Sequence, residues 1–336
     1  MRNAIKGFSL VELMVSIALG LMLLAGLATI FSNTTRARGE LQRSSQQVDN
    51  GRYAIEVLSE DVQLAGYYGE LDVSGMMVPG ALPDLCSVDP AIWNSAIPLH
   101  LQGIAPGGAL PACIPGSIVA GSSVVGVRRA QTCIAGVGTC DALVATQPYV
   151  QIALCSTSPS AYALGIAADT PFALQMKDCA TAAGVRRYVS RIYYISSNNG
   201  GGLNVPTLKR LELNGASFDD VPLVEGIERL HVEYGIDTDG DGDPDAYTPD
   251  PSSFNFAGCG ACSEPQNWSN VVTAKIYVLS RALEPSPGYT NTKVYELGLD
   301  AAGAAVRAGP FNDAFRRQVF STAVRVVNPS GRRETP

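Results

Sequence analysis

An uncharged apolar segment near the N-terminus constrains the fold of this 336-residue chain more than any other feature. Residues 13–35 carry no charge, and residues 13–31 are almost entirely apolar. A helix of about 20 such residues crosses the hydrocarbon core of a bilayer. Because Arg2 and Lys6 precede the segment, the positive-inside rule places the start of the chain in the cytoplasm and its bulk across the membrane.

A single acid, Glu12, stands at the start of this apolar segment. A carboxylate in an apolar helix is strongly unfavourable unless it is neutralised or paired, so Glu12 requires a partner. A buried core helix and a cleavable secretory signal are the alternative interpretations. The run is longer than the apolar core of a secretory signal, which spans about 7–15 residues, and its length and position favour a membrane helix.

The residues around Glu12 form a recognisable motif. Residues 6–13 read Lys-Gly-Phe-Ser-Leu-Val-Glu-Leu and resemble the prepilin cleavage motif of type IV pilins and type II secretion pseudopilins. In that family a membrane aspartic peptidase cuts after the glycine and methylates the new N-terminal residue. The resemblance implies cleavage between Gly7 and Phe8 and methylation of Phe8. It also implies that Glu12 acts in assembly, by pairing with the N-terminal amine of a neighbouring subunit.

Further stretches resemble the PilW family of minor pilins, whereas residues 72–183 match nothing in that family. The resemblance implies a minor pilin, a non-enzymatic subunit of the type IV pilus that contributes to pilus biogenesis or priming. A minor pseudopilin of a type II secretion system and a pilus-tip adhesin are the alternatives. The similar stretches are residues 49–61, 64–67, 225–228, 232–245 and 316–322.

The resemblance also implies a location and a set of partners. The protein would be an inner-membrane single-pass protein with a periplasmic head, later assembled into the extracellular pilus. Its partners would be other major and minor pilins, prepilin peptidase and the inner-membrane assembly platform. The net charge of −7, with basic residues clustered only in pairs, gives nucleic-acid binding no electrostatic basis.

A helical apolar stripe continues beyond the membrane segment. We expect one helix of about 85 Å from Phe8 to about Ala65, with a transmembrane part over residues 8–31 and an amphipathic part over 32–65. The pair Asn50-Gly51 favours a helix end, so a kink there is left open. The stripe consists of Leu41, Val48, Ile55, Leu58, Val62 and Ala65.

The rest of the chain predicts a β-rich head, and hence an α+β, type IV pilin-like fold with the long helix packed on a mainly antiparallel sheet. Residues 1–7 would be the leader, and residues 66–116, rich in glycine and proline, an irregular connection tied down by Cys86 and Cys113. The head would span residues 117–330, with a hairpin turn at 198–202. Strand patterns occur at residues 117–127, 149–155, 186–195, 208–213, 229–234, 271–280 and 318–327.

Eight cysteines follow the membrane segment, which favours disulfides in an oxidising compartment over buried free thiols. Their pairing cannot be derived from the sequence. Cys259 and Cys262 have the spacing of a redox pair or half a zinc site, but loop-like surroundings and only two histidines favour a structural disulfide. The cysteines are Cys86, Cys113, Cys133, Cys140, Cys155, Cys179, Cys259 and Cys262.

An acidic loop within residues 237–248 predicts a structural calcium site. Its acids occupy positions 1, 3, 5, 7 and 9 of an EF-hand-type loop, with Gly242 at the turn position. Thr248 stands where the bidentate glutamate belongs, so Asp250 would complete the shell and the affinity would be modest. A solvated acidic turn is the alternative. The proposed ligands are Asp237, Asp239, Asp241, Asp243 and Asp245.

Overall fold

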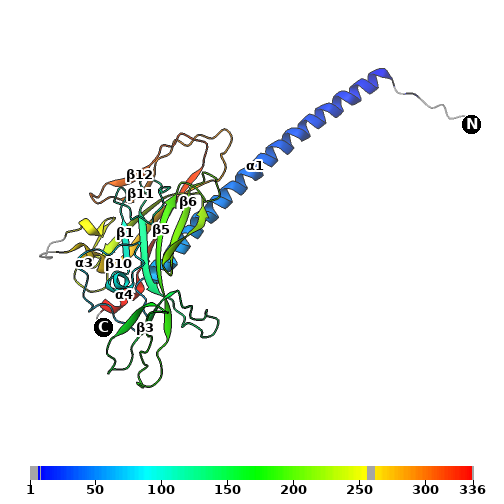
Figure 1. The fold of residues 1–336 in the computed structure, drawn as a ribbon. Helices are drawn as coiled ribbons and strands as arrows, with labels where there is room; N and C mark the ends of the chain where they lie inside the picture. The colour runs from blue at the N-terminus through cyan, green and yellow to red at the C-terminus, as the bar shows by residue number, and fades with distance from the viewer. Residues whose placement is uncertain (1–6, 8, 256–261, 335–336) are drawn as a thin grey trace, which may run out of the picture. The chain divides into compact units, whose positions relative to one another are not determined.

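The computed structural model describes residue 7, residues 9–255 and residues 262–334. The chain divides into two compact units, which we call the N-terminal unit (Met1–Gln46) and the head unit (Gln47–Pro336). The helix α1 (Leu10–Leu64) contributes its first part to the N-terminal unit and its last part to the head unit, as the blue ribbon of Figure 1 shows. The predicted leader, apart from Gly7, lies outside the described residues.

The helix α1 ends one residue before the predicted end. Ala65 and Gly66 leave the helix, and Gly66 adopts a positive φ of 71° that favours glycine. The side-chain amide of Asn328 lies 3.5 Å and 3.4 Å from the carbonyls of Leu64 and Ala65, so a distant segment caps the helix end.

The helix does not end or unwind at Asn50-Gly51, because α1 continues through both residues. Gly51 is a packing residue instead. A Cβ at Gly51 would lie 2.2 Å from the Phe320 ring, so only glycine lets this ring approach the helix backbone. Asn50 donates its amide hydrogen to the Glu225 carbonyl at 3.0 Å, a second link between helix and head.

Seven antiparallel strands form the larger sheet of the head unit. The strand β5 occupies its middle and pairs with β2, β3 and β6, and the predicted hairpin at residues 198–202 joins β5 to β6. The strands are β1 (Leu101–Ile104), β2 (Val124–Ala130), β3 (Pro148–Ile152), β4 (Tyr162–Ile166), β5 (Val185–Ser196), β6 (Thr207–Asn214) and β7 (Ser217–Glu225).

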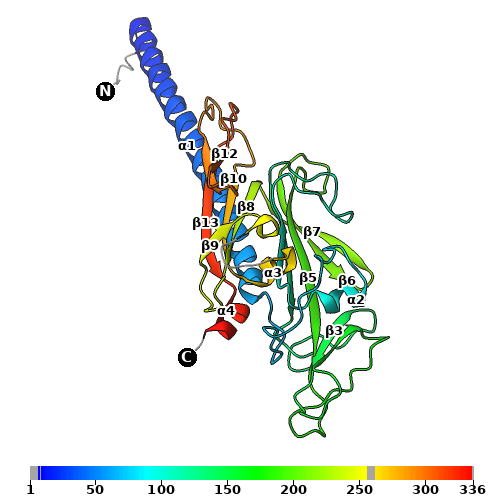
Figure 2. The same cartoon turned by 90° about the vertical axis from the view of Figure 1, so that its left-hand side faces the viewer.

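A second sheet has four strands in the order β13-β10-β8-β9, and a two-stranded ribbon, β11 with β12, packs beside it (Figure 2). Short helices α2 (Pro90–Ser95), η1 (Pro251–Ser253), α3 (Glu264–Ser269) and α4 (Val327–Arg333) complete the described fold. The strands are β8 (Ile227–Ile236), β9 (Ala246–Thr248), β10 (Val271–Arg281), β11 (Tyr295–Leu299), β12 (Ala305–Ala308) and β13 (Arg317–Arg325).

The main core lies between the last turns of α1 and both sheets. Leu58 and Val62 of the predicted stripe are buried here, together with Tyr193 of the larger sheet and Ile276 of the smaller one. Full burial of each large apolar side chain stabilises the fold by about 1.5–3 kcal/mol. The α+β prediction is therefore correct: a long N-terminal helix is followed by a head of antiparallel sheets that packs on the end of that helix.

The connection predicted over residues 66–116 is more ordered than expected. It contains α2 and β1, Trp93 is buried in a core cluster, and Leu101 belongs to the main core. A disulfide joins Cys86 to Cys113, the pair expected to tie this segment down. Proline and glycine mark turns within the segment, but tertiary contacts order the short elements between them.

Candidate assembly and metal sites

The N-terminal unit presents an apolar helix surface. Every residue from Leu10 to Leu19 is exposed, as are the large apolar side chains as far as Phe31. Among the described residues, α1 alone is long and apolar enough to cross a membrane. Four of its hydroxyl groups bond to carbonyls one turn earlier, which suits an environment without water. These hydroxyls belong to Ser16, Thr29, Thr34 and Thr35.

The three residues of the predicted processing and assembly site fall at the start of α1. Gly7 precedes the helix, Phe8 lies outside the described residues, and Glu12 is in the first turn. The side chain of Glu12 is exposed, and the helix N-terminus favours a negative charge at this place. A subunit packed against this surface could therefore reach the Glu12 carboxylate directly.

A buried ion-pair network holds the other end of α1 to the larger sheet. Asp61 accepts hydrogen bonds from Arg129 at 2.8 Å and from Arg191 at 2.9 Å, and also from the Tyr193 hydroxyl. Arg191 pairs in turn with Glu212 at 3.0 Å. Burial raises the pKa of Asp61, but the two guanidinium groups and the Tyr193 hydroxyl outweigh it and hold this pKa below its usual value.

No role for Asp61 was predicted from the sequence, although a signal was present. Asp61 stands three residues after Leu58 and one before Val62, so it interrupts the buried face of the helix. An acid on a buried helical face requires cationic partners, and Arg129 lies in the buried strand β2. The partner could not be chosen from the sequence, because the pairing depends on sheet topology.

The acidic loop gathers three of its five carboxylates. Oxygens of Asp237, Asp239 and Asp245 lie within 4.8 Å of one another, whereas Asp241 and Asp243 do not belong to this group. A hydrogen bond from the Asp241 N–H lowers the pKa of Asp239, but desolvation and the charges of the surrounding carboxylates together outweigh it and raise this pKa above its usual value. Carboxylate oxygens that repel one another in this way are ligands of the kind that bind a hard divalent cation.

The same loop already has a cationic partner. Asp237 is fully buried, and its carboxylate accepts hydrogen bonds from the backbone of Gly240 at 2.6 Å and of Gly242 at 3.1 Å. Arg333 of α4 reaches Asp237 at 3.1 Å. A bound cation would therefore share Asp237 with the Arg333 guanidinium.

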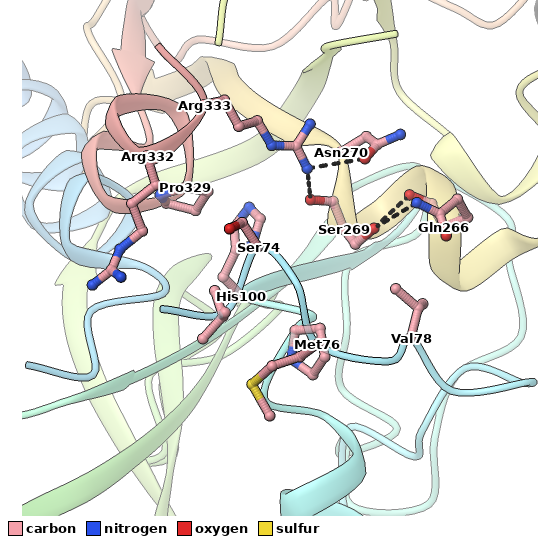
Figure 3. A pocket seen from close by; sticks show the side chains of 12 residues that line it. Ser74, Met76, Val78, His100, Gln266, Ser269, Asn270, Pro329, Arg332 and Arg333 are labelled. Carbon is pink, nitrogen blue, oxygen red and sulfur yellow. Dashed lines mark hydrogen bonds between the residues drawn. The ribbon is translucent and has the colours of Figure 1, made fainter. Parts of the chain in front are cut away.

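A pocket of about 200 Å³ lies beside Arg333. Figure 3 shows Arg333 turned towards Ser269 and Asn270, to which it donates hydrogen bonds of 2.9 Å each, and Arg332 turned away. His100 lines the pocket, and its Nε2 lies 2.6 Å from the Val271 carbonyl. Arg333 and His100 thus already have protein partners. We therefore interpret their polar groups as holding α4 in place rather than as binding a ligand in the pocket.

Three disulfides are described in the head unit. They join Cys86 to Cys113, Cys133 to Cys140 and Cys155 to Cys179. The last two close the turns of the lobe between β2 and β5, which contains β3 and β4. Cys262 is also disulfide-bonded, and Cys259 lies outside the described residues.

Comparison with known families agrees with this architecture. The prokaryotic N-terminal methylation motif matches residues 2–28, and the type IV pilus-assembly protein W family (PilW) matches residues 192–328. The chain contains an N-terminal methylation motif and a PilW domain. The domain runs from β5 to α4 and includes the acidic loop. The apolar helix and the methylation motif that precede it are consistent with membrane anchoring.

Among solved structures, a type IV-like pilin from Thermus thermophilus matches with a TM-score of 0.35 and 13% sequence identity. The match covers 84% of this PilW-domain protein and 96% of that chain. No curated protein matches the sequence.

Proposed function

We propose that this protein is a minor pilin that contributes to the biogenesis or priming of a type IV pilus. Prepilin peptidase cuts it between Gly7 and Phe8 and methylates Phe8. The helix α1 holds it in the inner membrane until the assembly platform inserts it among other major and minor pilins. The observation that carries the proposal is an exposed, apolar helix surface that overlaps the methylation motif and extends to Phe31.

The driving force for assembly is the packing of such helices against one another. Within the filament, the Glu12 carboxylate pairs with the N-terminal amine of a neighbouring subunit, and the pair neutralises two charges in an apolar setting. The PilW match supports a pilus rather than a type II secretion system as the destination.

Two measurements test this function. The intact mass of protein purified from its native envelope should show loss of residues 1–7 and the addition of one methyl group. Glu12→Ala should abolish incorporation into pili while leaving the protein in the membrane. Glu56→Ala is the matched control, since Glu56 is an exposed acid on the head-unit part of α1. Unprocessed protein in the envelope, or normal incorporation of Glu12→Ala, would contradict the proposal.

We also propose a structural calcium ion at Asp237, Asp239 and Asp245. The ion would relieve the repulsion among these carboxylates and fix the turn between β8 and β9. A site with so few charged ligands fits the affinity of extracellular modules, with Kd of about 10⁻⁴–10⁻³ M.

Thermal unfolding of the full chain in detergent tests the calcium site. With Kd of about 10⁻⁴ M, calcium at about 10 mM should stabilise the head by about 2.7 kcal/mol relative to chelator. Asp239→Asn should remove most of this gain without a large loss in the absence of calcium, because Asp239 is exposed. Equal midpoints for the wild type with calcium and with chelator would rule the site out.

A further inference from the structure

The strand β13 has one unpaired edge. It pairs with β10 over its full length of nine residues, and no other described strand pairs with it. At about 3.4 Å per residue, its free edge offers a backbone surface of about 30 Å. Figure 2 shows β13, in red, at one side of the smaller sheet.

The outward-facing groups of β13 can be assigned. Ala282 donates to the Arg316 carbonyl at 2.9 Å, and Val326 donates to the Val272 carbonyl at 2.8 Å. In an antiparallel pair the bonded residues alternate, so the even-numbered residues of β13 bond to β10. Val319, Ser321 and Ala323 therefore direct their N–H and C=O groups to the free edge.

The other long edge strand, β7, is protected against pairing. It also has nine residues, but it contains Pro222, which lacks an N–H, and the exposed acids Asp219 and Asp220. Proteins block exposed edges with such residues, or keep edge strands short. The edge strands β1, β4 and β9 have four, five and three residues. Within the described part of the head, β13 is thus the long edge without protection, since residues 318–324 hold no charge and no proline.

We propose that the free edge of β13 accepts an extended strand of a different pilin subunit, so that the sheet continues across the subunit boundary. This inference rests on the proposed role as a pilus subunit. The partner strand is uncharged opposite Val319–Ala323 and carries an acid near Arg325, whose exposed side chain pairs with the exposed Glu334 in the free protein. A second copy of this chain fits poorly, because β13 contains no acid and β7 is interrupted by Pro222.

A proline substitution tests the proposal in assembled pili. Ser321→Pro removes an outward N–H without breaking the ladder to β10, and we expect it to lower incorporation about tenfold at an almost unchanged Tm. Ser321→Thr keeps the donor and should incorporate normally. Normal incorporation of Ser321→Pro, with Glu12→Ala excluded from the same pili, would overturn the strand pairing and leave the proposed function intact.

Hydrogen exchange provides a measurement that needs no variant. On assembly, the amides of Val319, Ser321 and Ala323 should exchange at least about tenfold more slowly. The amides of Phe320 and Thr322 are already bonded in the free protein, so their exchange should change less. Unchanged exchange of the three outward amides would overturn the proposal. A photo-crosslinker at Ala323 identifies the occupant: attachment to another pilin supports the proposal, and attachment only to a second copy of this chain, or to nothing, contradicts it.

Discussion

Substitution of a single buried charged residue should strongly reduce the stability of the head unit. Asp61 brings a carboxylate from α1 into a core where Arg129 and Arg191 approach from two strands. A buried ion pair adds little net stability relative to apolar residues of the same shape, but removal of one member leaves the other uncompensated. The network therefore specifies where α1 docks more than it adds to the stability of the head.

Asp61→Asn should destabilise the head by about 3–5 kcal/mol, because it leaves two guanidinium groups without their shared carboxylate. Urea unfolding of the full chain in detergent, followed by tyrosine and tryptophan fluorescence, measures the loss. Glu56→Gln, an exposed acid of the same helix, should change stability by less than about 0.5 kcal/mol. Equal effects of the two substitutions would show that the network does not stabilise the docked helix.

Stability should depend on pH in two separate windows. Burial lowers the pKa of His100 to about 4, so the folded state keeps it neutral while the unfolded chain takes up a proton below about pH 6.5. Stability should fall between about pH 6.5 and 4, by up to about 1.4 kcal/mol per pH unit for this group. The lowered pKa of Asp61 adds a second loss as the pH falls below about 4.

Two variants separate these windows. His100→Gln should flatten the stability profile above pH 4, leaving the smaller slope of His231, whose pKa burial also lowers. Asp61→Asn should reduce the slope only below about pH 4, where Asp72, Asp245 and Asp313, whose pKa values are also below the usual one, still contribute. A wild-type profile that is level from pH 6.5 to 4 would mean that His100 is protonated without unfolding.

At the scale of elements, the contact between α1 and β13 decides how the helix meets the smaller sheet. Phe320 packs directly on the backbone at Gly51, and Gln47 donates to the Ser280 carbonyl at 3.0 Å nearby. Replacement of glycine by alanine inside a helix normally stabilises the helix by about 1 kcal/mol. At this position the Phe320 ring occupies the space that a methyl group would take.

Gly51→Ala should therefore destabilise the head by about 1–3 kcal/mol, against the helix propensity of alanine. Thermal unfolding of the full chain measures the change. Phe320→Leu, which shortens the side chain, should recover part of the loss in the double variant relative to the sum of the single ones. Stabilisation by Gly51→Ala alone would show that the ring moves aside without cost.

At the scale of the whole molecule, the sequence predicted the features that depend on local pattern. The apolar run, the stripe at Leu58 and Val62, and the hairpin between β5 and β6 follow from periodicity and turn residues. The strand β7 escaped prediction because Asp219, Asp220 and Pro222 disfavour strands, and only its pairing with β6 orders it. The cationic partners of Asp61 and Asp237 could not be predicted either, because Arg191 and Arg333 are distant from them in sequence and only the tertiary fold brings them together.

The C-terminal helix α4 joins several of these distant parts. Asn328 caps the end of α1, a Cβ at Gly242 would lie 2.6 Å from the Ser330 carbonyl, and Arg333 binds both Asp237 and the end of α3. The acidic loop, the helix end and α3 are thus held by one short segment. Loss of the Arg333 contacts should therefore affect both the acidic loop and the end of α3.

Arg333→Met should destabilise the head by about 3–5 kcal/mol in the presence of chelator, because the fully buried Asp237 loses its cation. With the proposed calcium ion, the loss should be smaller, since the ion supplies positive charge to the same carboxylate. Calcium should therefore raise the Tm of Arg333→Met more than that of the wild type. The neighbouring Arg332→Met is the control. Arg332 forms a 3.5 Å ion pair with the exposed Asp72 and donates a 3.3 Å hydrogen bond to the Gly69 carbonyl, and loss of these two contacts should shift stability by about 1 kcal/mol or less. Equal calcium responses of Arg333→Met and the wild type would mean that ion and guanidinium do not share Asp237.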